Sequence, residues 1–125
     1  MKISWPKVLN QDRRRFFAER WLVVATSSTI VVLVAAAWAL HYGIPPRTEP
    51  ITLHYTTSFG VDLIGPRNRM FIIPAFGVLV FLVNTILAMV VLRRERVVSY
   101  FLVFASFVLA LFLVFAEWTL ILQNR

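Results

Sequence analysis

The chain has 125 residues, of which 59% are hydrophobic and 15% are charged. Ordinary soluble domains are about 45–50% apolar and about 25% charged, so this composition excludes a typical soluble domain and predicts an integral membrane protein. The formal net charge is +7 and cysteine is absent, which excludes a disulfide framework and a thiolate metal site.

Three long apolar runs, at residues 21–42, 70–92 and 97–122, contain no lysine or arginine. Each is longer than the roughly 20 residues that a helix needs to cross about 30 Å of hydrocarbon. We therefore predict an all-α, multi-pass protein of the cell membrane with three transmembrane helices. The predicted segments are a basic interfacial segment at 1–20, transmembrane helices at 21–42, 70–92 and 97–122, an extracytoplasmic loop at 43–69, a basic cytoplasmic link at 93–96 and a C-terminal tail at 123–125.

The basic residues are distributed unevenly around these runs. Six precede the first run and three lie in the link at 93–96, so nine of the thirteen are on one side. The positive-inside rule then predicts a cytoplasmic N-terminus and a C-terminus outside. We expect anionic lipid headgroups, and not nucleic acid, as partners of this side. The predicted headgroup contacts are Arg13, Arg14, Arg15, Arg20, Arg93, Arg94 and Arg96.

The N-terminal 20 residues are interpreted as an interfacial segment. Trp5, Val8, Leu9 and Phe16 are expected in the headgroup layer, with the arginines facing phosphates, and a flexible tail is the alternative. The small-x-small pattern at 37–39 is also found at the end of a secretory signal. The first run is longer than a typical signal core and two more runs follow, so we expect it to stay as an anchor.

The first two runs each carry a face of small or polar residues. Ala25, Ser28, Thr29, Ala36 and Ala39 fall within about 100° at the helical period, and this face is expected to point into the bundle.

In the second run, Pro74, Gly77, Phe81, Asn84 and Ala88 lie close to one line. At about 1.5 Å per residue, Asn84 lies at nearly the depth of Thr29 and Ser106, which predicts a hydrogen-bonded layer across three spans. Because such bonds contribute only about 0.6 kcal/mol on average, we interpret the layer as packing and not as a conduction or binding site.

The third run carries Ser99, Ser106, Ala110 and Glu117 within a stripe of about 40°. Glu117 is the only acid in any run, and an ionisable group at such a depth is costly unless it pairs, protonates or reaches the interface. Three interpretations stay open. The carboxyl extends toward headgroups, it pairs with His41, Trp38 or an outer-loop arginine, or it serves in proton or ion coupling.

The loop at 43–69 is the segment that is large enough for structure outside the bilayer. Its prolines predict an extended entry, and residues 51–57 are rich in β-branched and aromatic side chains. With a turn at 58–60 and a second strand at 61–64, they predict a short β-hairpin or an extended flap.

The acids and histidines of the loop have no known metal-ligand spacing. His54 and Asp62, with Glu49, His41 and Glu117, are of the right types for a metal, but the spacing is no known signature. There is also no serine or cysteine nucleophile beside a base. We therefore expect no cofactor and no enzymatic activity. A third and weaker hypothesis is an enzyme in which His54 and Asp62 act together.

The loop motif resembles a group of small uncharacterised bacterial membrane proteins. In that group Pro-x-x-Leu-His-Tyr leads to Gly-Val-Asp-Leu-Ile-Gly-Pro and a helix that starts with proline, as at residues 50–55, 60–66 and 74 here. The loop is also distantly similar to a family of unknown function in membrane immunity proteins against a sporulation toxin. The resemblance covers residues 45–90, implies three spans and supplies no mechanism. It marks as candidate recognition residues His54, Tyr55, Gly60, Asp62, Gly65 and Pro66.

Two functions are consistent with these patterns. The first is a non-enzymatic accessory, scaffold or assembly element, forming a homo-oligomer or part of a larger membrane complex through its small-residue faces and outer loop. The alternative is an ion- or proton-coupled transport or immunity-type protein. In that case an oligomer would assemble Glu117 and Asn84 into a path, and the candidate intramembrane polar residues are Glu117, Asn84, Ser106, Ser28 and Thr29.

Overall fold

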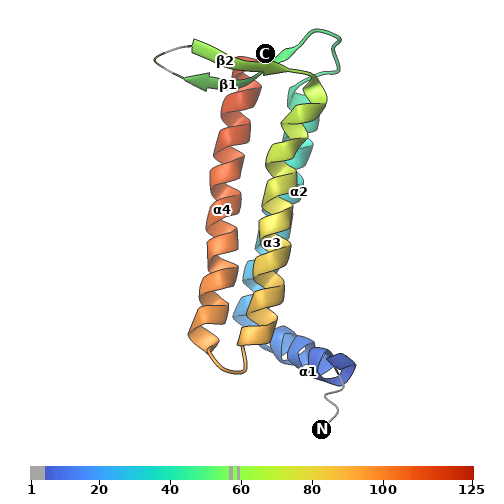
Figure 1. The fold of residues 1–125 in the computed structure, drawn as a ribbon, viewed down its shortest axis with the longest axis vertical. Coiled ribbons are helices and arrows are strands. Elements are labelled where there is room, and N and C mark those ends of the chain that lie inside the picture. The colour runs from blue at the N-terminus through green and yellow to red at the C-terminus, as the bar shows by residue number, and fades with distance from the viewer. Residues whose placement is uncertain (1–4, 57, 59) are drawn as a thin grey trace.

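The computed structural model describes the backbone of residues 5–56, 58 and 60–125, and their side chains except at 5, 54–56, 61 and 62. It is an elongated helical bundle with a β-hairpin at one end and a short helix turned aside at the other (Figure 1). In chain order the elements are α1 (Trp5–Ala18), α2 (Arg20–Gly43), β1 (Ile51–Thr56), β2 (Gly60–Gly65), the 3₁₀ helix η1 (Arg67–Phe71), α3 (Ile72–Val91) and α4 (Arg96–Gln123). We call the end that carries β1 and β2 the hairpin end, and the end that carries α1 and residues 92–95 the basic end.

Three segments of the described chain are long and apolar enough to cross a membrane. They are Arg20–Gly43, Arg67–Val91 and Arg96–Gln123, of 24, 25 and 28 residues. At about 1.5 Å per residue even the shortest covers about 36 Å, more than the hydrocarbon thickness. The prediction of a multi-pass membrane protein with three spans is confirmed. The orientation across the membrane stays a prediction.

The residues buried between the helices recur at intervals of three and four along α2, α3 and α4. This is the spacing at which straight helices present one seam to their neighbours and pack with a left-handed twist. α4 contacts both α2 and α3 extensively, while α2 and α3 contact each other less. The buried positions are Leu22, Thr29, Leu33, Ala36 and Leu40 in α2, Pro74, Gly77 and Ala88 in α3, and Ser99, Val103, Ser106, Ala110, Glu117, Leu120 and Ile121 in α4.

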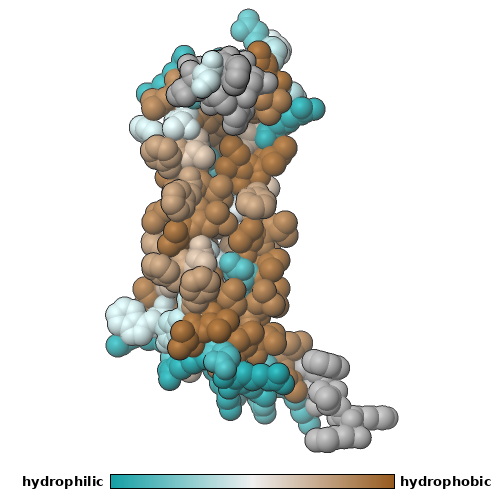
Figure 2. Space-filling view, turned by 60° about the vertical axis from the view of Figure 1, so that its left-hand side comes forward, coloured by the Kyte–Doolittle hydropathy of each residue, from teal (hydrophilic) through white to brown (hydrophobic). Residues whose placement is uncertain are grey.

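Most of the apolar surface of the bundle faces outward. Only 17–22% of the most apolar window in each span is buried inside the protein. Figure 2 shows this as a hydrophobic midsection, with hydrophilic residues gathered mainly at the two ends. The arrangement suits a bundle whose solvent is lipid, where association depends on packing at the seams.

Gly77 is a tightly packed position in the seam. A Cβ atom at this position would lie 2.6 Å from Cδ1 of Leu113 in α4 and 2.9 Å from Cδ2 of Leu33 in α2. Both distances are shorter than an ordinary van der Waals contact, so the missing side chain lets three helices converge. The expectation that this line of α3 points into the bundle agrees with the burial of Pro74, Gly77 and Ala88.

The small-residue face expected on α2 is only partly the buried one. Thr29 and Ala36 are buried, but Ala39 is exposed. Leucines occupy the remaining buried positions, at Leu22, Leu33 and Leu40. The seam of α2 therefore follows a heptad spacing that includes large residues, because the small residues of α3 and α4 already provide the close approach.

The two strands form an antiparallel hairpin across the hairpin end, as predicted. Ile51 pairs with Gly65 and Thr56 with Gly60, with irregular register between Thr52 and Tyr55. Gly60 has φ +73°, a backbone conformation that side-chain-bearing residues rarely adopt. The hairpin lies over the ends of the spans, which brings β1 next to the last residues of α4 (Figure 1).

At the basic end, α1 is a helix that turns away from the bundle axis (Figure 1). The turn is at Glu19, which is extended between α1 and α2, with φ −83° and ψ 97°. Phe16 is fully buried against Leu22, Ala88 and Val103. The α1–α2 turn folds the ring into the protein, and its expected depth in the headgroup layer stays a prediction. Leu9 is exposed, and the Trp5 side chain lies outside the described part.

Candidate functional site at the hairpin end

Asn124 fastens the hairpin to the end of α4. Its Oδ1 accepts from the backbone N–H of Thr52 at 2.8 Å, and its Nδ2 donates to the Thr52 carbonyl at 2.8 Å and to the Leu120 carbonyl at 2.9 Å. The amide thus pairs with both backbone groups of Thr52, as a neighbouring strand would. Arg47 adds a bond to the Asn124 carbonyl at 2.8 Å. Asn124, in the predicted C-terminal tail at 123–125, is buried.

Arg67, the first residue of η1 after the hairpin, is hydrogen-bonded to the end of α2. Its Nε donates to the Ile44 carbonyl and its Nη2 to the His41 carbonyl, each at 2.8 Å. These carbonyls lie at the end of α2, where helices leave acceptors without a partner and where a cation is favoured. The guanidinium also lies 5.9 Å from the ring centre of Phe71. The last turn of α2 is thereby tied to η1.

An apolar cluster fills the space beneath the hairpin. β1 contributes Ile51, whose side chain is buried against the helix ends. Burial of such a side chain contributes about 1.5–3 kcal/mol, so the hairpin is held by packing as well as by hydrogen bonds. The buried members of the cluster are Leu40, Ile44, Ile51, Met70, Leu120 and Ile121.

Glu117 lies one turn below this cluster on α4. Its side chain is 2% exposed, and neither carboxyl oxygen has a hydrogen-bond partner among the described residues. The structure therefore directs the carboxyl into the bundle and not toward the headgroups. Trp38 and His41, considered as its partners, are exposed. Sequence periodicity located this residue on the seam, but its lack of a partner becomes apparent only in three dimensions.

The predicted recognition residues are spread along the hairpin. His54 and Tyr55 belong to β1 and Asp62 to β2, and their side chains lie outside the described part. Gly60 begins β2, and Gly65 ends it in a buried position. A Cβ at Gly65 would lie 2.7 Å from Leu53 Cδ1, so this glycine serves the contact between strands. Pro66 is exposed and precedes η1.

β2 carries two exposed apolar side chains at consecutive positions, which point to opposite faces of the hairpin. Leu63 and Ile64 are 49% and 58% exposed, while Ile51 on the paired strand is buried. The sheet has two strands, and Asn124 occupies the free edge of β1 at Thr52. Among the described residues, no side chain is bonded to the edge of β2, and Leu63 and Ile64 are its exposed apolar side chains.

The polar layer predicted in the middle of the spans forms between two helices. Asn84 Nδ2 donates to Ser106 Oγ at 3.0 Å, joining α3 to α4. Thr29 and Ser28 do not join this layer, because their hydroxyls donate to carbonyls one turn back in α2, at 2.8 Å each. Threonine and serine hydroxyls inside helices commonly donate to the carbonyl one turn back in this way.

At the basic end, two of the arginines predicted to contact headgroups make ion pairs within the protein. Arg93 pairs with Asp12 of α1, and Arg96 pairs with Glu19. The Tyr100 hydroxyl also donates to Glu19 at 2.9 Å. Arg93 in addition donates to Gln11 at 2.9 Å. The remaining predicted contacts are exposed, with Arg13 also donating to Asn10 at 3.0 Å: Arg13, Arg14, Arg15, Arg20 and Arg94.

Hydrogen bonds from Arg96, and secondarily from Tyr100, lower the pKa of the Glu19 carboxyl below its ordinary value of 4.5. The carboxyl therefore stays ionised over the physiological range.

Within the described residues, acids and histidines form no group of three that is able to hold a metal. The expectation of no cofactor stays a prediction.

Comparison with protein-family models, curated proteins and solved structures gives no match for this chain. The resemblance of the loop to small bacterial membrane proteins stays a prediction. Function is therefore inferred from the geometry of the chain itself.

Proposed function

We propose that the protein is a non-enzymatic accessory or assembly element of a membrane complex, and that its hairpin contacts the partner. The main supporting observation is that Asn124 bonds the hairpin to the end of α4, and Arg67 bonds the adjoining η1 to the end of α2. Leu63 and Ile64 of the hairpin stay exposed. A surface that is already fixed loses little conformational entropy on binding. An open strand edge with apolar side chains is also a common docking element for an added strand.

The partner is another protein of the same membrane or a second copy of the chain. Both fit a bundle whose outward surface is apolar over most of its length and whose polar groups are largely satisfied within the protein. Ser99, for example, donates to the Ala88 carbonyl at 2.9 Å across the seam between α3 and α4. These internal bonds support a structural role for the spans.

The test is photo-crosslinking in native membranes. A photoreactive amino acid at Ile64 is expected to give a discrete crosslinked protein, whereas the same group at the exposed, lipid-facing Phe112 of α4 gives none. Asn124→Ala, which frees the hairpin, is expected to reduce the Ile64 product. A lack of any protein product at Ile64, or a product unchanged by Asn124→Ala, contradicts the proposal.

A second candidate is the proton- or ion-coupled transport or immunity-type protein. It is favoured by one observation, the buried carboxyl of Glu117 without a partner among the described residues. Against it, Asn84 bonds Ser106, and eleven residues of α4 separate Ser106 from Glu117, about 16 Å along the helix. Such a path would need other chains to fill the gap.

Glu117→Gln distinguishes the two candidates. The substitution preserves shape and removes the ionisable group. If the protein couples proton movement, flux into proteoliposomes should fall strongly in the variant. If it is an assembly element, the Ile64 crosslink should persist in the variant and flux should be absent in both proteins.

A further inference from the structure

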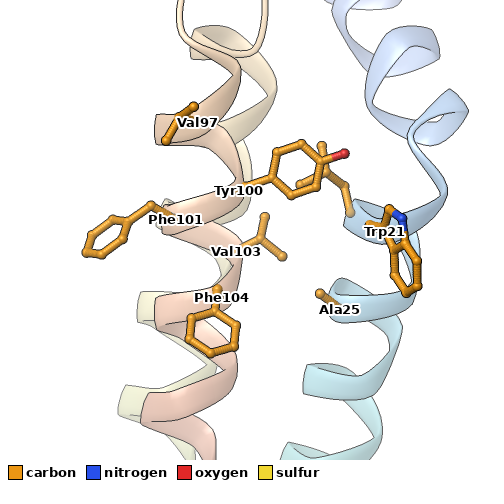
Figure 3. A pocket seen from close by; sticks show the side chains of 8 residues that line it. Trp21, Ala25, Val97, Tyr100, Phe101, Val103 and Phe104 are labelled. Atoms are coloured by element: carbon orange, nitrogen blue, oxygen red, sulfur yellow. The ribbon is translucent and has the colours of Figure 1, made fainter.

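A groove lies between α2 and α4 near the basic end, on the lipid-facing side of the bundle. Its volume is about 470 Å³. Trp21 and Ala25 line it from α2, and Tyr100, Val103 and Phe104 line it from α4 (Figure 3). Along α4 the lining begins at Val97, directly after Arg96, and ends at Phe104. The groove therefore runs about 10 Å into the membrane from its basic boundary.

The groove exists because the two helices meet here through unequal side chains. Ala25 is small and packs against the cluster that contains the buried Val103, so it forms a shallow floor between Trp21 and the aromatic side chains of α4. Tyr100 forms a wall, and its ring is held in place because its hydroxyl donates to Glu19 at 2.9 Å. Arg96 holds the same carboxylate. The wall that Tyr100 forms is therefore held by contacts within the protein.

Positive charge gathers at the mouth of this apolar groove. Arg20 is exposed at the first residue of α2, with its guanidinium 5.6 Å from the ring centre of Trp21. The Arg96 side chain is 64% exposed although it pairs with Glu19. Arg94 is exposed in the adjoining link. Two acids belong to this group: Glu19, which is engaged by Arg96 and Tyr100, and Glu95, which is exposed between Arg94 and Arg96. The three arginines Arg20, Arg94 and Arg96 outnumber these two acids, so the mouth keeps a net positive charge.

We propose that this groove binds one acyl chain of an anionic phospholipid from the adjoining leaflet, with the phosphate contacting Arg20 and the exposed side of Arg96. The apolar walls match the chain, and guanidinium groups match a phosphate because they donate several hydrogen bonds in one plane. The amphipathic form, apolar inside and cationic at the membrane boundary, is complementary to a lipid and to no soluble anion. The inference concerns the basic end and does not rest on the function proposed for the hairpin.

The test uses tryptophan quenching by brominated lipids. Trp5→Phe, Trp38→Phe and Trp118→Phe together leave Trp21 as the one tryptophan, since the chain has four. The protein is reconstituted in vesicles that contain brominated phosphatidylglycerol or brominated phosphatidylcholine in an unbrominated background. We expect half-maximal quenching of Trp21 at an about fivefold lower fraction of the anionic lipid, the preference that one arginine near the membrane surface provides.

Three variants show whether the preference belongs to this groove. Arg20→Gln is expected to remove most of it and Arg20→Lys to retain most of it, while Arg69→Gln, an exposed arginine near the hairpin end, leaves it unchanged. A protein whose only tryptophan is the exposed Trp38 reports ordinary surrounding lipid and is expected to show no preference. Circular dichroism checks that each variant keeps its helices.

Three results contradict the proposal. Equal quenching of Trp21 by the two lipids shows that the groove holds surrounding lipid without selection. Quenching by neither lipid shows that the groove is closed to acyl chains, as it would be if a second copy of the protein covered it. Persistence of the preference in Arg20→Gln also contradicts the assigned phosphate contact.

Discussion

The two ends of the bundle are fastened by different chemistry. At the hairpin end, the Asn124 amide and the Arg67 guanidinium bind backbone groups of Thr52, Ile44 and His41 above an apolar cluster. At the basic end, α1 is held by the buried Phe16 and by ion pairs between side chains. Backbone groups cannot titrate or move far, whereas paired side-chain charges respond to salt and pH.

This difference suits the two environments that we infer. A hairpin that presents a docking surface benefits from a fixed position, and its fastening by the uncharged Asn124 amide to backbone groups is insensitive to salt and pH. A helix at a charged membrane surface exchanges its ion pairs with lipid phosphates, so its fastening is adjustable. The following substitutions test the contrast, from the largest expected effect to the smallest.

Asn124→Ala should have the largest effect. It removes three hydrogen bonds and leaves both backbone groups of Thr52 without their partner, which we expect to lower the free energy of unfolding in detergent by about 3 kcal/mol. Asn124→Asp keeps the acceptor for the Thr52 N–H, so its free energy of unfolding should lie between that of the wild type and that of Asn124→Ala. Gln123→Ala, at the neighbouring exposed position, is the control. An effect of Asn124→Ala no larger than this control refutes the role of the amide.

Arg67→Gln should come next. The last carbonyls of α2 lose a charged donor, and a loss of about 2 kcal/mol is expected in the same unfolding measurement. Arg69→Gln, at an exposed arginine two residues further on, should change stability little. Equal losses in the two variants would indicate a general charge effect instead of capping.

Asp12→Asn should weaken the basic end by a smaller amount. The amide keeps an acceptor for Arg93 but loses the charge, so we expect a loss of about 1 kcal/mol. Hydrogen exchange of α1 amides is the appropriate measurement, because the change is confined to this helix. Its effect should shrink at high salt, while that of Asn124→Ala should not. Salt dependence of equal size at both ends contradicts the contrast.

Glu19→Gln should have the smallest effect, since its pair with Arg96 is exposed to solvent. Because the folded-state pKa of Glu19 lies below its ordinary value of 4.5, its contribution is fully present above that pH and is lost as the pH falls through the folded-state value. The protection of α1 amides should therefore decline below pH 4.5 in the wild type more than in Glu19→Gln. An identical decline in the two proteins rules out this carboxyl as the cause.

The spans and the hairpin were predictable because local patterns specify them. Charge-free runs of sufficient length indicate membrane helices, and β-branched residues flanked by prolines and glycines indicate strands. The stripe from Ser99 to Glu117 and the bond between Asn84 and Ser106 also follow from helical spacing and depth. These features require only that each helix be straight and that its neighbours lie at equal depth.

The fastening residues were not predictable in the same way. Asn124 bonds Thr52, which is 72 residues away, and Arg67 bonds a carbonyl 23 residues away. No periodicity relates such positions. The one available signal was a polar asparagine directly after an apolar helix, a residue type typical of helix ends. For Thr29, the predicted contact with another helix does not form, because its hydroxyl donates to a carbonyl of its own helix.

The central claim is that the hairpin is a fixed platform, and a distance measurement tests it most directly. The chain has no cysteine, so spin labels are introduced at Leu63→Cys on β2 and Phe112→Cys on α4, both exposed. In proteoliposomes we expect one narrow distance distribution, unchanged by high salt and broadened by Asn124→Ala. A broad distribution with Asn124 intact, or a narrow one that Asn124→Ala leaves unchanged, contradicts the account.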